Sequence, residues 1–215
     1  FYQEKEKGEH LLKYAKSIPK SDEAVNSQYM ENGWHKLKEP PNLVLACIAS
    51  LPFMLICGAI NLALLAWINP AMFDFLNADA LKITFQLDQL LLCIVVLYAY
   101  MFLHEMLHAV LIPGFAHSDK TVWGLRAGFG FVYTAEEITK WRFTVISLAP
   151  YCVLSVIATL VLSALNLMNG YIAFILLANA AGSCVDFLNV ILVLVQVPHD
   201  GKIVSNGNQT YYSGK

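Results

Sequence analysis

The chain has 215 residues, of which 57% are hydrophobic and only 14% are Asp, Glu, Lys or Arg, and its formal net charge at pH 7 is -2. A soluble domain usually contains about 25% charged residues, so this chain has too few charges to cover a water-facing surface of its size. The composition excludes an ordinary soluble enzyme and a disordered chain, and the small net charge excludes a nucleic-acid binder.

Residues 1–41 form the polar part of the sequence. They hold 14 of the 30 charged side chains and end at Pro40-Pro41. We expect a cytoplasmic or interfacial N-terminal segment with short helices. The five cysteines lie in apolar runs without Cys-x-x-Cys spacing, so we interpret them as small hydrophobic residues.

Residues 42–197 contain four apolar segments. A helix needs about 20 mostly apolar residues to cross a bilayer, and each segment is long enough. We therefore predict an all-α membrane protein with four transmembrane helices and short membrane-associated strands in the loops. The predicted helices are Leu43–Ile68, Gln89–Ile112, Phe143–Met168 and Tyr171–Val197.

Two loops have strand character. Leu81–Leu87 alternates apolar and polar residues, as a half-buried strand does. Thr121–Thr134 is rich in Val and aromatic residues and is broken by three glycines, which indicates one kinked strand or a short hairpin lying against the membrane. We expect residues 198–215 to be a cytoplasmic tail.

The positive charges predict the orientation. With four spans, 13 of the 14 Lys and Arg residues lie on the side that holds both termini and the loop 113–142, and Lys82 alone lies on the other side. The positive-inside rule places that richer side in the cytoplasm. We expect a multi-pass protein of the bacterial cytoplasmic membrane, embedded in the lipid bilayer, with both termini inside.

The second predicted helix contains the motif His104-Glu105-Met106-Leu107-His108. The spacing i, i+4 places both imidazoles on one helix face, close enough to share a zinc ion. Glu105 stands where it can take a proton from a water molecule that attacks a peptide bond. Because ionisable side chains are costly inside a bilayer, we interpret this cluster as functional.

A catalytic zinc ion usually has three protein ligands, so the two histidines need a partner. We predict Asp186, because it is the only Asp, Glu, His, Lys or Arg in the fourth helix. His104 lies about 14 Å and Asp186 about 18 Å from the cytoplasmic ends of two helices that run in the same direction. The alternatives lie in predicted loops and are Glu136, Glu137, His117, His199 and Asp200.

Asn179 and Asn189 are polar residues of the Asp186 helix. They could hydrogen-bond the aspartate, a substrate or the oxyanion of the reaction, or they could simply link neighbouring helices.

An intramembrane H-E-x-x-H, a strand segment, one further span and a span with an Asp resemble the site-2 protease group of intramembrane metalloproteases. More closely, HEMLHAVLIPG with GSCVDFLNV resembles a family of small bacterial membrane zincin peptidases. The resemblance implies a zinc endopeptidase with one zinc per chain, held by His104, His108 and Asp186, and with Glu105 as the catalytic base. The chain differs from site-2 proteases in having no proline in residues 171–197, which favours an unbroken fourth helix.

The resemblance also implies how a membrane protein or peptide substrate binds, namely as an added strand along an edge strand within Thr121–Thr134. The residues that this implicates in substrate binding are Trp123, Leu125, Phe129 and Phe131, together with Asn179. Two other functions use the same residues: a zinc or proton transporter, and an inactive membrane scaffold. The identity of the substrate and the oligomeric state are open at this point.

Overall fold

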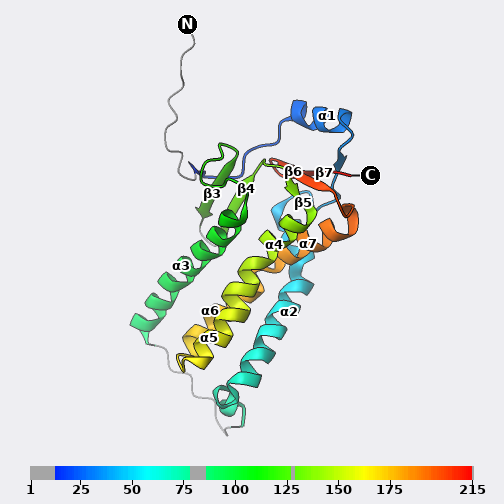
Figure 1. Cartoon of the computed structure of the whole chain (residues 1–215). Helices are drawn as coiled ribbons and strands as arrows, with labels where there is room; N and C mark the ends of the chain where they lie inside the picture. The colour runs from blue at the N-terminus through cyan, green and yellow to red at the C-terminus, as the bar shows by residue number, and fades with distance from the viewer. Residues whose placement is uncertain (1–12, 78–85, 127–128, 215) are drawn as a thin grey trace.

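The computed structural model describes residues 13–77, 86–126 and 129–214. Four long helices form its body (Figure 1). All four are long and apolar enough to cross a membrane, which confirms the predicted helical segments apart from small shifts of their ends. They are α2 (Leu43–Ile68), α3 (Leu87–Leu111), a third helix made of α4 (Lys140–Pro150), η2 (Tyr151–Ile157) and α5 (Ala158–Ala164), and a fourth made of α6 (Gly170–Gly182) and α7 (Cys184–Gln196).

The helices pack with α2 against α6 and α7, and with α3 against α4 and α6. Their outward faces carry large apolar side chains. Leu55 on α2, Val95 on α3 and Val195 on α7 are 69%, 65% and 79% exposed. A surface of this kind is unfavourable in water and favourable in lipid.

The third helix changes its winding at Pro150, where the π-helical segment η2 begins. The fourth helix runs as one span over Gly170–Gln196, as expected, with a one-residue irregularity at Ser183 where α6 ends and α7 begins. The Ser183 hydroxyl donates to the carbonyl of Asn179 at 3.0 Å, and a bond of this kind to residue i−4 often bends a helix. Asp186 consequently lies in the first turn of α7.

Two small sheets lie at one end of the helical bundle (Figure 1). The first has the order β1-β3-β4, where β1 is Lys13–Tyr14, β3 is Thr121–Arg126 and β4 is Phe129–Thr134. Strands β3 and β4 are antiparallel, so of the two expected alternatives, a kinked strand and a short hairpin, the structure has the hairpin; β1 pairs in parallel with the other edge of β3. In this sheet β4 is therefore an edge strand.

The second sheet has the order β2-β7-β6-β5, with β2 at His35–Lys36, β7 at Gln209–Ser213, β6 at Lys202–Asn206 and β5 at Ile138–Thr139. Strands β6 and β7 form a hairpin with Gly207 at φ +61° in its turn. The segment 198–215, which was expected to be only a tail, thus contains the hairpin that pairs with β2 of the N-terminal segment on one side and with β5 on the other. The predicted all-α class also has to be corrected, because the protein is mostly helical but contains two sheets. The strands of these sheets pair with partners far away in the sequence, and local pattern does not reveal such pairing.

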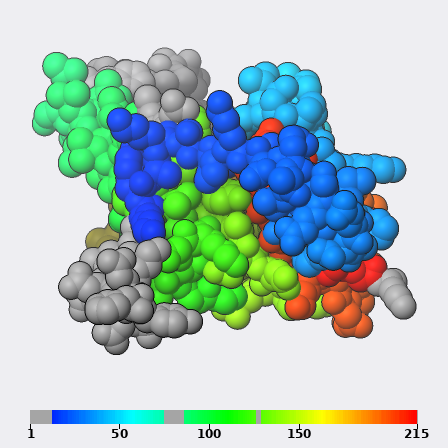
Figure 2. Space-filling model, turned by 90° about the horizontal axis from the view of Figure 1, so that it is seen from above, coloured from blue at the N-terminus to red at the C-terminus, as the bar shows by residue number. Residues whose placement is uncertain are grey.

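The N-terminal segment contains one of the expected short helices, α1 (Glu23–Glu31). It packs on the C-terminal hairpin, where the rings of Tyr29 and Tyr211 lie 5.4 Å apart and Asn206 donates to Asn26 at 2.8 Å. Figure 2, which looks onto this end, shows the segment from β1 to α2 lying across the molecule. After α2 comes the short helix η1 (Pro70–Asn77). The expected strand Leu81–Leu87 lies mostly outside the described residues, and Leu87 itself begins α3.

Candidate metal centre

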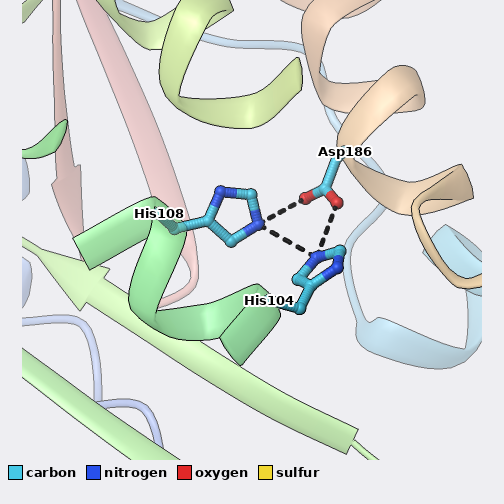
Figure 3. Close-up of side chains that lie close together, drawn as sticks. All are labelled: His104, His108 and Asp186. Atoms are coloured by element: carbon cyan, nitrogen blue, oxygen red, sulfur yellow. Dashed lines mark hydrogen bonds and ion pairs between the residues drawn. The ribbon is translucent and has the colours of Figure 1, made fainter. Parts of the chain in front are cut away.

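Three side chains that the sequence placed on two different helices meet inside the bundle (Figure 3). The Nε2 atoms of His104 and His108 are 3.2 Å apart. They lie 3.3 and 3.5 Å from the two carboxylate oxygens of Asp186. Among the described residues, this is the one cluster of three or more His, Cys, Asp or Glu side chains suited to a metal ion.

The spacing of these atoms fits zinc. Zinc binds His nitrogen at about 2.0–2.1 Å and carboxylate oxygen at about 2.0–2.2 Å in a tetrahedron, whose edges are then about 3.3–3.5 Å long. The separation of 3.2 Å between the two Nε2 atoms is close to such an edge. Each Nε2 atom lies at a similar distance from a different oxygen of Asp186, and one ligand atom from each of the three residues lies within 4.8 Å of the others. Three ligands of a tetrahedral ion leave one position for water or substrate.

Hydrogen bonds on the far side of each imidazole set its tautomer. The Nδ1 atom of His104 faces the side-chain carbonyl oxygen of Asn179 at 2.9 Å. The amide of Asn179 is oriented by its own NH₂ group, which donates to the hydroxyl of Ser155 at 2.8 Å. Because a carbonyl oxygen only accepts, His104 carries a hydrogen on Nδ1, and its Nε2 atom faces the cluster.

His108 is oriented by a backbone carbonyl that a proline leaves without its helical partner. Its Nδ1 atom faces the Ile146 oxygen at 2.8 Å. In a regular α-helix this carbonyl would accept from the N–H of residue 150, but residue 150 is proline. With Nδ1 of each imidazole bonded to a carbonyl oxygen, Nε2 is the atom that each histidine would offer to a metal ion.

We expect Pro150→Ala to weaken zinc binding about 10- to 100-fold, the usual cost of losing a partner that orients a metal ligand. The new N–H of residue 150 would compete with His108 for the Ile146 carbonyl. The dissociation constant can be measured by competition with a chromogenic chelator. The matched control is Pro52→Ala, because Pro52 lies inside α2. An unchanged dissociation constant, or an equal loss in Pro52→Ala, would contradict this role.

Glu105 is buried between α3 and β4, with 8% of its surface exposed. A β-carbon added at Gly130 of β4 would lie 2.4 Å from Cγ and 2.9 Å from Oε1 of Glu105. Only glycine therefore lets the strand pass this close to the carboxylate. Glu105 thus stands one residue from a candidate metal ligand and against the backbone of an edge strand.

The rival third ligands lie elsewhere. The Glu136 carboxylate accepts from the Ser118 hydroxyl at 2.7 Å. Glu137 accepts from Lys202 at 3.0 Å. His199 and Asp200 pair with each other at 2.9 Å on the surface, and His117 is not part of the cluster.

Of the residues expected to bind substrate, Asn179 already uses its carbonyl for His104 and its NH₂ group for Ser155 and, at 3.4 Å, the Pro150 carbonyl. These contacts make it an interhelical link and a support for His104. Its role in substrate binding stays a prediction.

The aromatic candidates lie on the β3–β4 hairpin, but in different environments. The Trp123 ring contacts Phe102 of α3 at 5.4 Å. Phe131 is buried, with its ring where a β-carbon of Gly124 would be, whereas Phe129 is 37% exposed. Leu125 pairs with Gly130. Because Glu105 lies against Gly130 of β4, a substrate strand next to Glu105 would join β4, and the roles of these side chains in binding it stay predictions.

Sequence reasoning missed two supports of the metal centre. The free Ile146 carbonyl could have been found from the sequence, because a proline four residues later inside an apolar helix leaves that carbonyl without its usual N–H donor. Ser155, which orients Asn179, had no such signal, because a single serine in a membrane span has many possible partners.

Comparison with known proteins supports a zinc site at these residues. Residues 95–201 match a protein family described as “Putative zincin peptidase”. The matched stretch contains His104, Glu105, His108 and Asp186, and it ends just before β6. No curated protein and no solved structure matches the chain. The family match indicates a zinc metallopeptidase.

Proposed function

We propose that this chain is a membrane-embedded zinc endopeptidase in which His104, His108 and Asp186 bind one Zn²⁺ and Glu105 is the general base. The observation that carries the proposal is the convergence of two imidazole nitrogens and a carboxylate oxygen to within 4.8 Å of one another inside an apolar bundle. The family match over the same residues supports peptide hydrolysis as the reaction.

The membrane setting rests on the four apolar helices and their outward-facing Leu, Ile and Val side chains. Among the described residues, the segments 13–41 and 198–214 and the loop after α3 carry most of the Lys and Arg side chains, and they lie at the sheet end (Figure 1). The positive-inside rule favours a cytoplasmic sheet end in a multi-pass protein of the cell membrane. The metal centre then lies inside the bilayer, toward its cytoplasmic face.

A bound zinc ion supplies a Lewis acid that polarises the scissile carbonyl and lowers the pKa of water toward 7. Glu105 takes the proton of the attacking water as the new C–O bond forms. It then delivers that proton to the amide nitrogen as the C–N bond breaks. The edge of β4 holds the peptide in an extended form beside Glu105, and the surrounding helices exclude bulk water.

We expect the purified full-length protein to contain about one zinc per chain, to lose peptide hydrolysis when 1,10-phenanthroline removes the metal, and to recover it when zinc is added back. Metal content can be measured by inductively coupled plasma mass spectrometry. The double variant His104→Ala/His108→Ala should contain no stoichiometric zinc. His35→Ala/His199→Ala, which changes two exposed histidines, should keep it. Equal zinc content in both double variants would refute the site.

A further inference from the structure

A cavity of about 170 Å³ lies beside the metal centre, and His108 and Asp186 form part of its wall. Residues of three strands, β4, β5 and β6, form the rest of the wall on the sheet side. The loop between β4 and β5 and residues of α3, α4 and α7 complete it. Its apolar lining includes Ile112, Val132, Ile138, Phe143, Ile146 and Ile203. The cavity therefore joins the candidate active site to the sheet end of the molecule.

Two strand edges face this cavity. Three consecutive residues of β4 (132–134) and three of β6 (203–205) line it. Because neighbouring residues of a strand point to opposite faces, a wall of consecutive residues means that the strand edge itself faces the space. Strand β4 is the edge of its sheet, and β5 pairs only with Lys202 and Ile203 of β6. Within the described residues, β4 has no strand partner on its cavity side, and β6 has one there only at Ile203, so the β6 edge is unpaired at residues 204–205.

One side chain ties these edges together. The hydroxyl of Tyr133 on β4 donates to the Ser205 carbonyl of β6 and accepts from the Gly207 N–H, both at 3.1 Å. These bonds fix the separation of the two sheets. The cavity is therefore a formed feature of the fold.

The size of the cavity matches one apolar side chain, and more of its surface is apolar than polar, although polar side chains such as Asn189 and Ser147 also line it. An apolar protein cavity of roughly 150 Å³ accommodates a group the size of benzene. Glu136, the one Glu in the lining, already accepts from Ser118 and lies 3.9 Å from Lys120. The space thus favours a Leu-, Met- or Phe-sized group over a charged one.

The position of the cavity fits a peptide that lies along β4. Glu105 touches this strand at Gly130, and the cavity begins at Val132. Two residues of a strand span about 7 Å. A peptide whose scissile bond lies beside Glu105 would therefore place a side chain one or two residues away into the cavity.

We propose that this cavity is the specificity pocket of the peptidase, and that it selects substrates with a medium-sized apolar residue next to the scissile bond. The proposal rests on the proposed function for its position relative to the scissile bond. It adds the chemical class of the substrate, and it assigns to the C-terminal hairpin the role of forming one wall of the site.

The test uses a substitution on β6 that fills the pocket with a larger side chain. Ser205 of this strand lines the cavity, and Ile203, two residues earlier on the same face of the strand, lines it as well. Ser205→Phe should therefore place a ring in the cavity. The matched control is Asn208→Phe, which adds the same ring to the exposed turn of the same hairpin. Val132→Ala, which enlarges the pocket from β4, provides a second variant with an opposite effect.

Each variant is combined with Glu105→Gln, so that bound peptides are not cleaved, and is immobilised in detergent micelles after loading with zinc. A proteome-derived peptide library is passed over it, and the retained peptides are sequenced by mass spectrometry. We expect retained peptides to share one position enriched in Leu, Met or Phe. Ser205→Phe should reduce that enrichment about 10- to 100-fold, Val132→Ala should shift it toward Phe and Trp, and Asn208→Phe should leave it unchanged.

Three outcomes would each overturn the proposed specificity pocket. They are retained peptides that share no apolar position, no retained peptides at all, and the same enrichment in Ser205→Phe as in the protein without that change. The outcomes for the proposed function are separate. If the apolar position is found but wild-type protein cleaves none of the retained peptides, the pocket stands as a peptide-binding site and the peptidase proposal fails.

Discussion

Glu105→Gln protein is expected to keep one zinc per chain and to lose peptide hydrolysis by a factor of about 10²–10⁴, the usual contribution of a general base. The amide has nearly the shape of the carboxylate but cannot take the proton of the attacking water. Because Glu105 is not part of the three-residue cluster, the metal should stay bound. The measurement pairs metal analysis with initial rates on peptides identified from the library.

The control for this variant is Glu137→Gln, which makes the same chemical change at an exposed residue paired with Lys202. It should hydrolyse peptides at the wild-type rate. Wild-type rates in Glu105→Gln would rule out the mechanism. If that variant also carried zinc across the membrane of proteoliposomes, the transporter alternative would replace the peptidase.

Asp186→Ala is expected to weaken zinc binding by more than about 100-fold, and to abolish hydrolysis with it. Losing a partner that merely orients a ligand costs about 10- to 100-fold, and losing a ligand should cost more. The variant also leaves the two Nε2 atoms, 3.2 Å apart, without the carboxylate that faces them. The dissociation constant of zinc, measured by chelator competition, provides the test.

Two matched variants separate Asp186 from its rivals. Asp200→Ala removes an exposed aspartate beside His199, and Glu136→Gln changes a carboxylate that lines the cavity. Both should bind zinc as the wild type does. Loss of zinc in either of them, with zinc retained in Asp186→Ala, would move the third ligand to a loop.

The metal centre depends on irregularities in helices that are otherwise uniform. The break at Ser183 places Asp186 at the start of α7, and Pro150 frees the Ile146 carbonyl for His108. The π-helical segment that follows Pro150 contains Ser155, which holds Asn179 against His104. The free Ile146 carbonyl is a contact that a regular helix would not offer, because a regular helix uses its backbone groups internally.

A further set of bonds holds α7 in place from its other end. Lys140, at the start of α4, is only 8% exposed and donates to the carbonyls of Leu194 and Val197 at 3.0 and 2.6 Å. Gln196 exchanges two hydrogen bonds with the backbone of Lys38, at 2.8 and 3.0 Å. The helix that carries Asp186 is thereby fixed to both the third helix and the N-terminal segment.

The sequence by itself determined the parts of this protein that depend on local pattern. Length and apolarity were sufficient for the four long helices, and the i, i+4 spacing placed His104 and His108 on one face of α3. The scarcity of charge within the spans singled out Asp186 as their partner, because a lone carboxylate there has few acceptable environments. These inferences needed no knowledge of how the helices pack.

Tertiary structure alone decided the rest. The two-residue strands β2 and β5 have no pattern of their own, and they form only because the C-terminal hairpin lies between them. The contacts of Ile146 and Asn179 with the histidines, and the cavity between β4 and β6, likewise depend on which segments meet in space. Local periodicity carries no information about such pairings, because their partners lie tens of residues apart and are brought together only by packing.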